Sequence, residues 1–213
     1  MIVLSLFDGG SMGRQALLDA GLKVDKYYAS EIEKDAIENT QRNFPDTIQL
    51  GDVSNWREWD IETPDLIIGG SPCQGFSRQG VGLNFDDPRS KLFFVYNDIV
   101  EHYHSINPDL KFMLENVDMK KEWEQVITEH VGVEPMKINS ELFLPQNRPR
   151  TYWTNFEIPK ISAIQYSLLD YLDDVELDDY EIIEGIKVSN EFTEKHKSLI
   201  IRTDDDELAI KQA

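Results

Sequence analysis

Apolar residues along this chain occur in short runs, separated by polar or glycine-containing segments. Runs of about four to eight apolar, aromatic or β-branched residues are typical of buried strands. The pattern predicts strands at Val3–Phe7, Lys26–Ser30, Thr47–Leu50, Asp65–Gly69, Leu110–Leu114, Val133–Ile138 and Thr151–Thr154.

The segments between these runs contain helix-forming residues with apolar positions three or four apart. They predict helices at Arg14–Ala20, Glu33–Arg42, Ser90–His104 and Lys120–His130. Strands that alternate with helices favour an α/β fold, a mostly parallel seven-stranded sheet with helices on both faces.

The alternation weakens after Pro159, where acidic residues become frequent and apolar periodicity fades. We therefore expect one folded domain over residues 1–160. Residues 161–213 are expected to form an acidic C-terminal extension that is partly helical.

Charge and cysteine content narrow the range of functions. The formal net charge is −19, which counts against tight, autonomous DNA binding. A single cysteine excludes an intramolecular disulfide and suits a reducing cytoplasm. The run of apolar residues at the start of the chain is too short for a signal peptide or a membrane span. No cluster of Cys and His residues has the spacing of a zinc site. We expect a cytoplasmic protein that contacts neither membrane nor metal.

Candidate cofactor chemistry follows the first three strands. The turn Asp8–Gly13 is rich in glycine and precedes a helix, whose free N–H groups can face a ligand. The turn lacks the Gly-Lys-Ser/Thr sequence of a P-loop, so we do not expect it to bind a nucleoside triphosphate. Glu31 comes 22 residues after Gly9, at the spacing of a carboxylate that binds ribose hydroxyls. Asp52 could accept from an adenine amine, or it could cap a helix that begins near Ser54.

Candidate catalytic residues follow the later strands. Cys73 comes after a buried strand and Pro72, so it could be a nucleophile or a small buried apolar residue. Glu115 ends the fifth strand, and Arg148 and Arg150 precede the seventh. The carboxyl ends of parallel strands meet at one edge, where a thiol, a carboxyl and an arginine suit covalent catalysis on a planar base. Glu115 could also be a buried carboxylate paired with either arginine.

Four segments, in this order, resemble the motifs of the cytosine-C5 DNA methyltransferase family. They are Asp8–Gly13, Gly70–Ser77, Glu115–Val117 and the Gln-x-Arg-x-Arg stretch Gln146–Arg150. The resemblance covers roughly residues 2–160. It implies a Rossmann-like methyltransferase fold and DNA (cytosine-5-)-methyltransferase activity, as in restriction-modification. It also implies transfer of the methyl group of S-adenosyl-L-methionine to C5 of a cytosine flipped from duplex DNA.

The resemblance also implies roles for individual residues. Cys73 would add to C6, Glu115 would hold the N3 edge, and Asn116 would fix the loop. Arg150, and less directly Arg148, would contact the O2 region of the base, and Gln146 opens that motif. The expected cofactor residues are Phe7, Asp8, Gly9, Gly10 and Gly13 around the methionine part, Glu31 and Ile32 at the ribose, Asp52 and Val53 at the adenine, and Gly70, Pro72 and Leu92 on the sulfonium side.

Two features of the family are not found. The residues after Trp153 contain no basic, aromatic-rich recognition region and no Gly-Asn-type closing motif. We therefore keep three functions open. The chain could be a methyltransferase whose recognition part lies in a second chain, a cofactor-binding regulatory relative, or an RNA (tRNA) cytosine-C5 methyltransferase.

Overall fold

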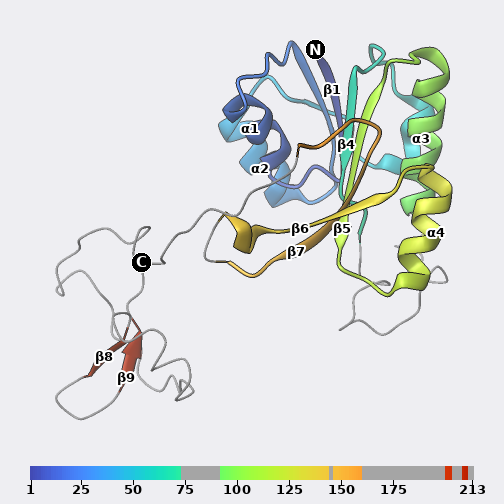
Figure 1. The fold of residues 1–213 in the computed structure, drawn as a ribbon. Helices are drawn as coiled ribbons and strands as arrows, with labels where there is room; N and C mark the ends of the chain where they lie inside the picture. The colour runs from blue at the N-terminus through green and yellow to red at the C-terminus, as the bar shows by residue number, and fades with distance from the viewer. Residues whose placement is uncertain (73–91, 144–145, 160–199, 203–207, 211–213) are drawn as a thin grey trace. The chain divides into compact units, whose positions relative to one another are not determined.

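A seven-stranded sheet forms the centre of the fold in the computed structural model (Figure 1). Its strands are β1 (Ile2–Leu6), β2 (Lys26–Ser30), β3 (Ile48–Gln49), β4 (Leu66–Gly69), β5 (Lys111–Val117), β6 (Pro135–Asn139) and β7 (Pro149–Thr154). Their order is β3-β2-β1-β4-β5-β7-β6. Neighbours from β3 to β5 pair in parallel, whereas β7 pairs antiparallel with both β5 and β6. The predicted mostly parallel α/β sheet is confirmed.

The reversed direction of β7 places its first residues beside the last residues of β5. Arg150 is the register partner of Val117, and Tyr152 is the partner of Glu115. This pairing reaches the end of β5 at Val117, so Glu115 and Asn116 both lie within the paired part of the strand. A segment that precedes a strand can thus meet residues at the carboxyl end of its neighbour.

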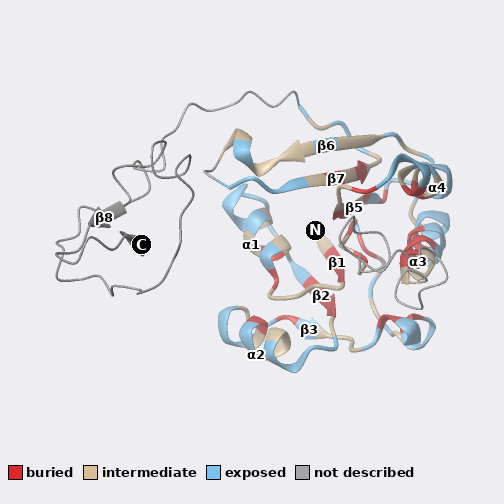
Figure 2. Cartoon of the chain, turned by 90° about the horizontal axis from the view of Figure 1, so that it is seen from below, coloured by how far each residue is buried: buried red, intermediate tan, exposed pale blue. Residues whose placement is uncertain are grey.

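Helices cover both faces of the sheet (Figures 1 and 2). On one face lie α1 (Met12–Asp19) and α2 (Lys34–Asn43), and on the other α3 (Leu92–Ile106) and α4 (Lys121–Val131). Two short 3₁₀ helices, η1 (Val53–Glu58) and η3 (Ser140–Leu142), complete the described helices of this unit.

The strand side chains divide between two apolar clusters, as expected for alternating residues of a sheet covered on both faces. Leu4 and Leu6 belong to the larger cluster, which includes Phe93 of α3 and Ile127 of α4. Val3 faces the opposite side with Tyr27, Ala29, Leu66 and Ile68. Both layers therefore hold the carboxyl ends of the central strands in place.

The structure describes residues 1–72, 92–143, 146–159, 200–202 and 208–210. The chain divides into two units, residues 1–142 with 146–163, and residues 143–145 with 164–213. Within the second unit, β8 (Ile200–Arg202) and β9 (Leu208–Ile210) form an antiparallel pair. The rest of the extension expected to be partly helical lies outside the described residues. Among the helices described, none has the length and apolar character needed to cross a membrane.

Candidate active site and cofactor cavity

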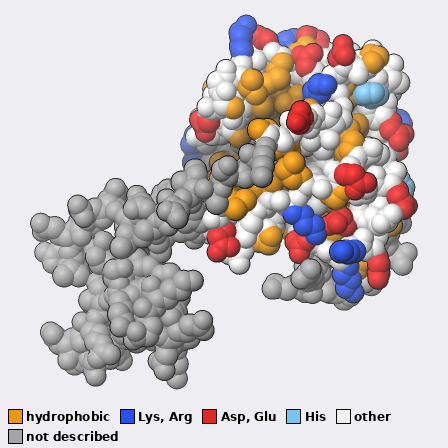
Figure 3. All heavy atoms as spheres, viewed as in Figure 1, with side chains coloured by type: hydrophobic (Ala, Val, Ile, Leu, Met, Phe, Trp, Pro, Cys, Tyr) orange, Lys and Arg blue, Asp and Glu red, His pale blue; other side chains and the backbone are white. Residues whose placement is uncertain are grey.

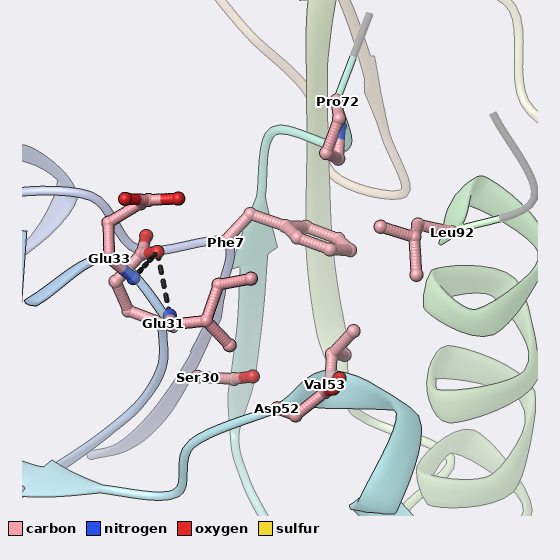
Figure 4. Close-up of a pocket in the computed structure, with 9 residues that line it drawn as sticks. Phe7, Ser30, Glu31, Glu33, Asp52, Val53, Pro72 and Leu92 are labelled. Carbon is pink, nitrogen blue, oxygen red and sulfur yellow. Dashed lines mark hydrogen bonds between the residues drawn. The ribbon is translucent and has the colours of Figure 1, made fainter. Parts of the chain in front are cut away.

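A cavity of about 210 Å³ lies at the carboxyl ends of β1, β2 and β4 (Figure 4). Its lining consists of Phe7, Ser30, Glu31, Ile32, Glu33, Asp52, Val53, Pro72 and Leu92. The ring of Phe7 points into the cavity toward Leu92, with Pro72 and Val53 on either side. The cavity thus combines an apolar wall with carboxylates, as small-ligand sites commonly do.

Phe7 adopts a backbone conformation that bulky residues rarely use. Its φ is 58°, in the left-handed region, which carries a steric cost for a residue with a Cβ. The next residue is held in place because the amide of Asp8 donates to the carbonyl of Ser30 at 3.1 Å. Strain of this kind tends to occur at ligand sites, and here it directs an aromatic ring into the cavity.

The carboxylate of Glu31 is fixed by three backbone amides. Gly9 N donates to Oε2 at 2.7 Å, and the amides of Ile32 and Glu33 donate to Oε1 at 2.8 and 3.0 Å (Figure 4). These bonds tie the end of β2 to the glycine turn after β1. They leave about one lone pair, on Oε2, that a ribose hydroxyl could use, since a carboxylate offers about four acceptor sites.

Asp52 caps η1 and lines the cavity as well. Its Oδ1 accepts from the amide of Ser54 at 2.8 Å, so the capping interpretation is confirmed. The preceding Gly51 has φ +73°, and its carbonyl accepts from the Ser30 hydroxyl at 2.7 Å. Ser30 therefore fixes the turn that presents Asp52. The sequence reasoning missed Ser30 and Glu33, although both flank Glu31.

The expected cofactor residues of the first turn lie outside the cavity lining. Asp8 accepts from Tyr27 Oη at 2.7 Å and from the hydroxyl of Ser11. A methyl group added at Gly13 would come 2.5 Å from Ile68 Cδ1, so this glycine allows α1 to lie against β4. Gly9 and Gly10 complete the turn. Of these residues Gly9 connects to the cavity, because its amide donates to the lining carboxylate of Glu31.

An ion pair joins two of the expected catalytic residues. Arg150 Nε lies 2.7 Å from Glu115 Oε1, and both side chains are partly buried. Burial raises the pKa of Glu115, while the charges of Arg150 and Arg148 act in the opposite direction without cancelling the shift. The site therefore favours a carboxyl that keeps its proton at higher pH than an exposed glutamate does.

Asn116 connects β5 to the segment that follows β4. Its side-chain amide donates to the carbonyl and the hydroxyl of Ser71 at 3.3 and 3.2 Å, and its Oδ1 accepts from the amide of Val117 at 2.9 Å. Asn116 and Ser71 are both buried. Buried amide groups need such partners, so this contact fixes the backbone immediately before Pro72.

The other described residues expected at the site do not line the cavity or join the Glu115–Arg150 ion pair. Cys73 lies outside the described residues. Gln146 and Arg148 are exposed in the loop before β7, where the Gln146 carbonyl accepts from Ser140 Oγ at 2.8 Å. The Arg148 amide donates to Asn139 Oδ1 at 2.9 Å. Gly70 lies against Glu115 and is not part of the cavity lining. Among the described residues no group of three or more His, Cys, Asp or Glu is arranged to hold a metal ion.

Bacterial and phage methyltransferases are similar in sequence to much of this chain. The type II methyltransferase M1.ScrFI of Lactococcus lactis subsp. cremoris is 35% identical over 151 residues, covering 66% of this chain and 38% of the relative. The orphan methyltransferase M.Rho11sI of Bacillus phage rho11s is 32% identical over 163 residues, covering 70% of this chain and 32% of the relative. The chain thus spans about a third to two fifths of the length of these relatives.

Solved structures show the same fold. A mutant of Spodoptera frugiperda DNMT2 superposes with a TM-score of 0.58 at 21% identity, covering 86% of this chain and 62% of that one. Schizosaccharomyces pombe Dnmt2 methyltransferase gives 0.60 at 19% identity, with 94% and 67% covered. The Rossmann-like methyltransferase fold is therefore confirmed.

A family model connects these observations. The model described as C-5 cytosine-specific DNA methylase matches residues 1–198, which includes every described residue of the cavity and of the Glu115–Arg150 pair. The chain belongs to the C-5 cytosine-specific DNA methylase family.

Proposed function

We propose that this chain is the catalytic part of a DNA (cytosine-5-)-methyltransferase. It would transfer the methyl group of S-adenosyl-L-methionine to C5 of cytosine, with Cys73 as the nucleophile and residues 1–160 as the catalytic domain. Family membership supports the reaction class. The activity itself is our inference, because the chain spans only part of its named relatives.

One observation carries the proposal most directly. The three residues before Cys73 connect the cavity to β5. Pro72 lines the cavity, Ser71 is bound by Asn116, and Gly70 lies against the carboxylate of Glu115. A cofactor in the cavity and a base beside Glu115 would thus meet at one short segment, the arrangement that group transfer between two bound molecules needs.

The cavity suits an adenosyl cofactor. Glu31 offers a carboxylate held by three amides, and Asp52 offers a second one in the same cavity lining. Phe7, Val53 and Leu92 provide surfaces on which a purine and the methylene groups beside the sulfonium can pack. We assign Glu31 to the ribose and Asp52 to the adenine amine. The bound cofactor supplies an electrophilic methyl group.

The chain's own groups would activate the base. The Cys73 thiolate adds to C6, and the electron pair of the C5–C6 double bond shifts toward C5 and the ring N3 side. Glu115 holds N3 and donates a proton as charge develops there, while Arg150 fixes that carboxyl and faces O2. As C5 takes the methyl group, the N3 proton returns to Glu115. The C5 proton then leaves to a base, the C5–C6 double bond re-forms and the thiolate departs. Atoms and charge therefore balance over the cycle.

DNA recognition depends on how the charged side chains are distributed over the surface. On the face shown in Figure 3, Lys and Arg side chains are scattered among Asp and Glu rather than gathered in one patch. Basic surface is the usual electrostatic basis of duplex binding. We propose that a second chain supplies target recognition, whereas this chain carries out the chemistry and by itself reacts with DNA only at high DNA concentration.

The test is a trapping experiment with 5-fluorocytosine, whose fluorine cannot leave as the C5 proton does. The purified chain is incubated with S-adenosylmethionine and with duplex DNA or tRNA that carries the analogue. We expect a covalent protein–DNA adduct that Cys73→Ala does not form, although it still binds the cofactor. An adduct with tRNA alone would make the chain an RNA methyltransferase. Cofactor binding without either adduct would favour the regulatory function.

A further inference from the structure

Gly70 is a glycine whose missing side chain makes room for a candidate catalytic group. A methyl group built on its Cα would lie 2.9 Å from Glu115 Oε2 and 3.8 Å from the Glu115 carbonyl oxygen. The first distance is shorter than a normal carbon–oxygen contact. The glycine therefore permits the carboxylate to lie directly against the backbone before Ser71.

Backbone conformation does not explain the glycine. The described glycines in the left-handed region are Gly9, Gly21, Gly51 and Gly132, and Gly70 is not among them. A residue with a Cβ could adopt the backbone angles at this position without left-handed strain. The requirement at position 70 is the space that Glu115 occupies.

The neighbouring glycine differs in what it touches. A methyl group at Gly69 would come 2.9 Å from the Leu6 carbonyl oxygen and 2.9 Å from the ring of Tyr96. Those atoms belong to a paired strand and to a fully buried side chain, so neither can move easily. At Gly70 the obstructing atom is the end of a flexible side chain. An alanine there would displace the carboxylate rather than the backbone.

Contacts on two sides fix the position of the Glu115 carboxylate. Its Oε1 is bound by Arg150 Nε at 2.7 Å, while Oε2 lies toward Gly70. The carboxylate is thus confined between the start of β7 and the end of β4. A methyl group on the β4 side would turn it away from the ion pair or toward solvent.

We propose that Gly70 is a positioning residue, which sets where the Glu115 carboxyl meets the base. This inference rests on the proposed function, in which Glu115 holds N3 of cytosine. It assigns Gly70 to the catalytic carboxyl and not to the cofactor. The resemblance to the family places Gly70 with the cofactor residues instead.

The first test compares Gly70→Ala with Gly69→Ala in the full chain. We expect Gly70→Ala to lower turnover about 100-fold, the effect of misplacing a catalytic group by about 1 Å. Its S-adenosylmethionine affinity and thermal midpoint should stay near wild type. Gly69→Ala should instead lower the thermal midpoint clearly. Wild-type turnover in Gly70→Ala, or a loss of cofactor affinity as large as the loss of turnover, would overturn the proposal.

A double-mutant cycle distinguishes an effect of Gly70→Ala through Glu115 from a general disturbance of the fold. Aspartate is one methylene shorter than glutamate, so Glu115→Asp vacates the space next to position 70. Gly70→Ala should then cost little more turnover on top of Glu115→Asp, because residues that act through a contact are not additive. Fully additive losses in turnover would contradict a role through Glu115.

A measurement without turnover keeps this inference separate from the proposed function. The carboxyl carbon of Glu115 can be titrated by NMR in isotope-labelled protein. Gly70→Ala should lower the pKa of Glu115, since the displaced carboxylate becomes more exposed to water. If the wild-type chain transfers no methyl group, the proposed function fails while this shift still tests the contact. An unchanged titration would reject the role of Gly70 even in an active enzyme.

Discussion

At the scale of single residues, Glu115 shows how the fold tunes a side chain that the sequence only identifies. Burial raises its pKa, and the pairing with Arg150 does not reverse that shift. The folded protein thus binds this proton more tightly than the unfolded chain. The associated stabilisation is full below the unfolded pKa and is lost as the pH rises through the folded value.

The variant Glu115→Gln separates the effect of this carboxyl on stability from its effect on turnover. Glutamine resembles the protonated carboxyl in shape, so the variant should lose little stability at neutral pH. Relative to wild type, its thermal midpoint should improve as the pH rises from 4 to 8. Turnover should fall by about 100- to 10,000-fold, the usual contribution of a general acid or base. Unfolding scans across pH, with methyl-transfer assays alongside, measure both. A wild-type rate in Glu115→Gln would remove this residue from the proposed chemistry.

The sequence identified the polar groups of the site better than it identified their contacts. Glu115, Arg150 and Asn116 were expected because their residue types and order are distinctive. The contact of Asn116 with Ser71 spans 45 residues, and the approach of Glu115 to Gly70 spans a similar distance. Such contacts depend on the register of β4 against β5, in which Gly69 pairs with Leu114. No local pattern specifies that register.

At the scale of elements, the apolar pattern located the strands because each fills a buried layer. It could not show that β7 runs antiparallel, because the direction of a strand leaves no trace in the periodicity of its residues. That direction brings Arg150 to Glu115, although Arg150 is near the start of its strand. Residues at opposite ends of their own strands therefore share one site.

The packing of α1 on the sheet gives an element-scale prediction. Gly13→Ala would place a methyl group 2.5 Å from Ile68 Cδ1, and we expect this overpacking to cost about 1–3 kcal/mol. Ile68→Val removes that Cδ1 and alone should cost about 0.5–1.5 kcal/mol. The double variant should be more stable than the sum of the two losses indicates. Urea denaturation of the four proteins measures the coupling, and strict additivity would refute this contact as the cause.

At the scale of the whole molecule, charge sets how the chain meets nucleic acid. With a net charge of −19 it is repelled by a polyanion, and the Debye length shortens from about 30 Å at 0.01 M salt to about 8 Å at 0.15 M. We expect the isolated chain's affinity for labelled duplex DNA to stay flat or rise over this range. Fluorescence anisotropy would show it. A steep fall with salt would instead reveal a basic contact surface.

The division of the chain gives the last prediction, which tests the proposed catalytic domain. All nine cavity-lining residues and the Glu115–Arg150 pair precede residue 164, where the second unit resumes. A fragment of residues 1–163 should therefore fold, bind S-adenosylmethionine as the full chain does, and unfold at a similar temperature. The family match extends to residue 198, so a fragment of residues 1–198 is the matched comparison. If the fragment unfolds or loses the cofactor while 1–198 retains both, the catalytic domain includes part of the acidic extension. Calorimetry on the three lengths decides between these boundaries, since an independent unit keeps its own cooperative transition.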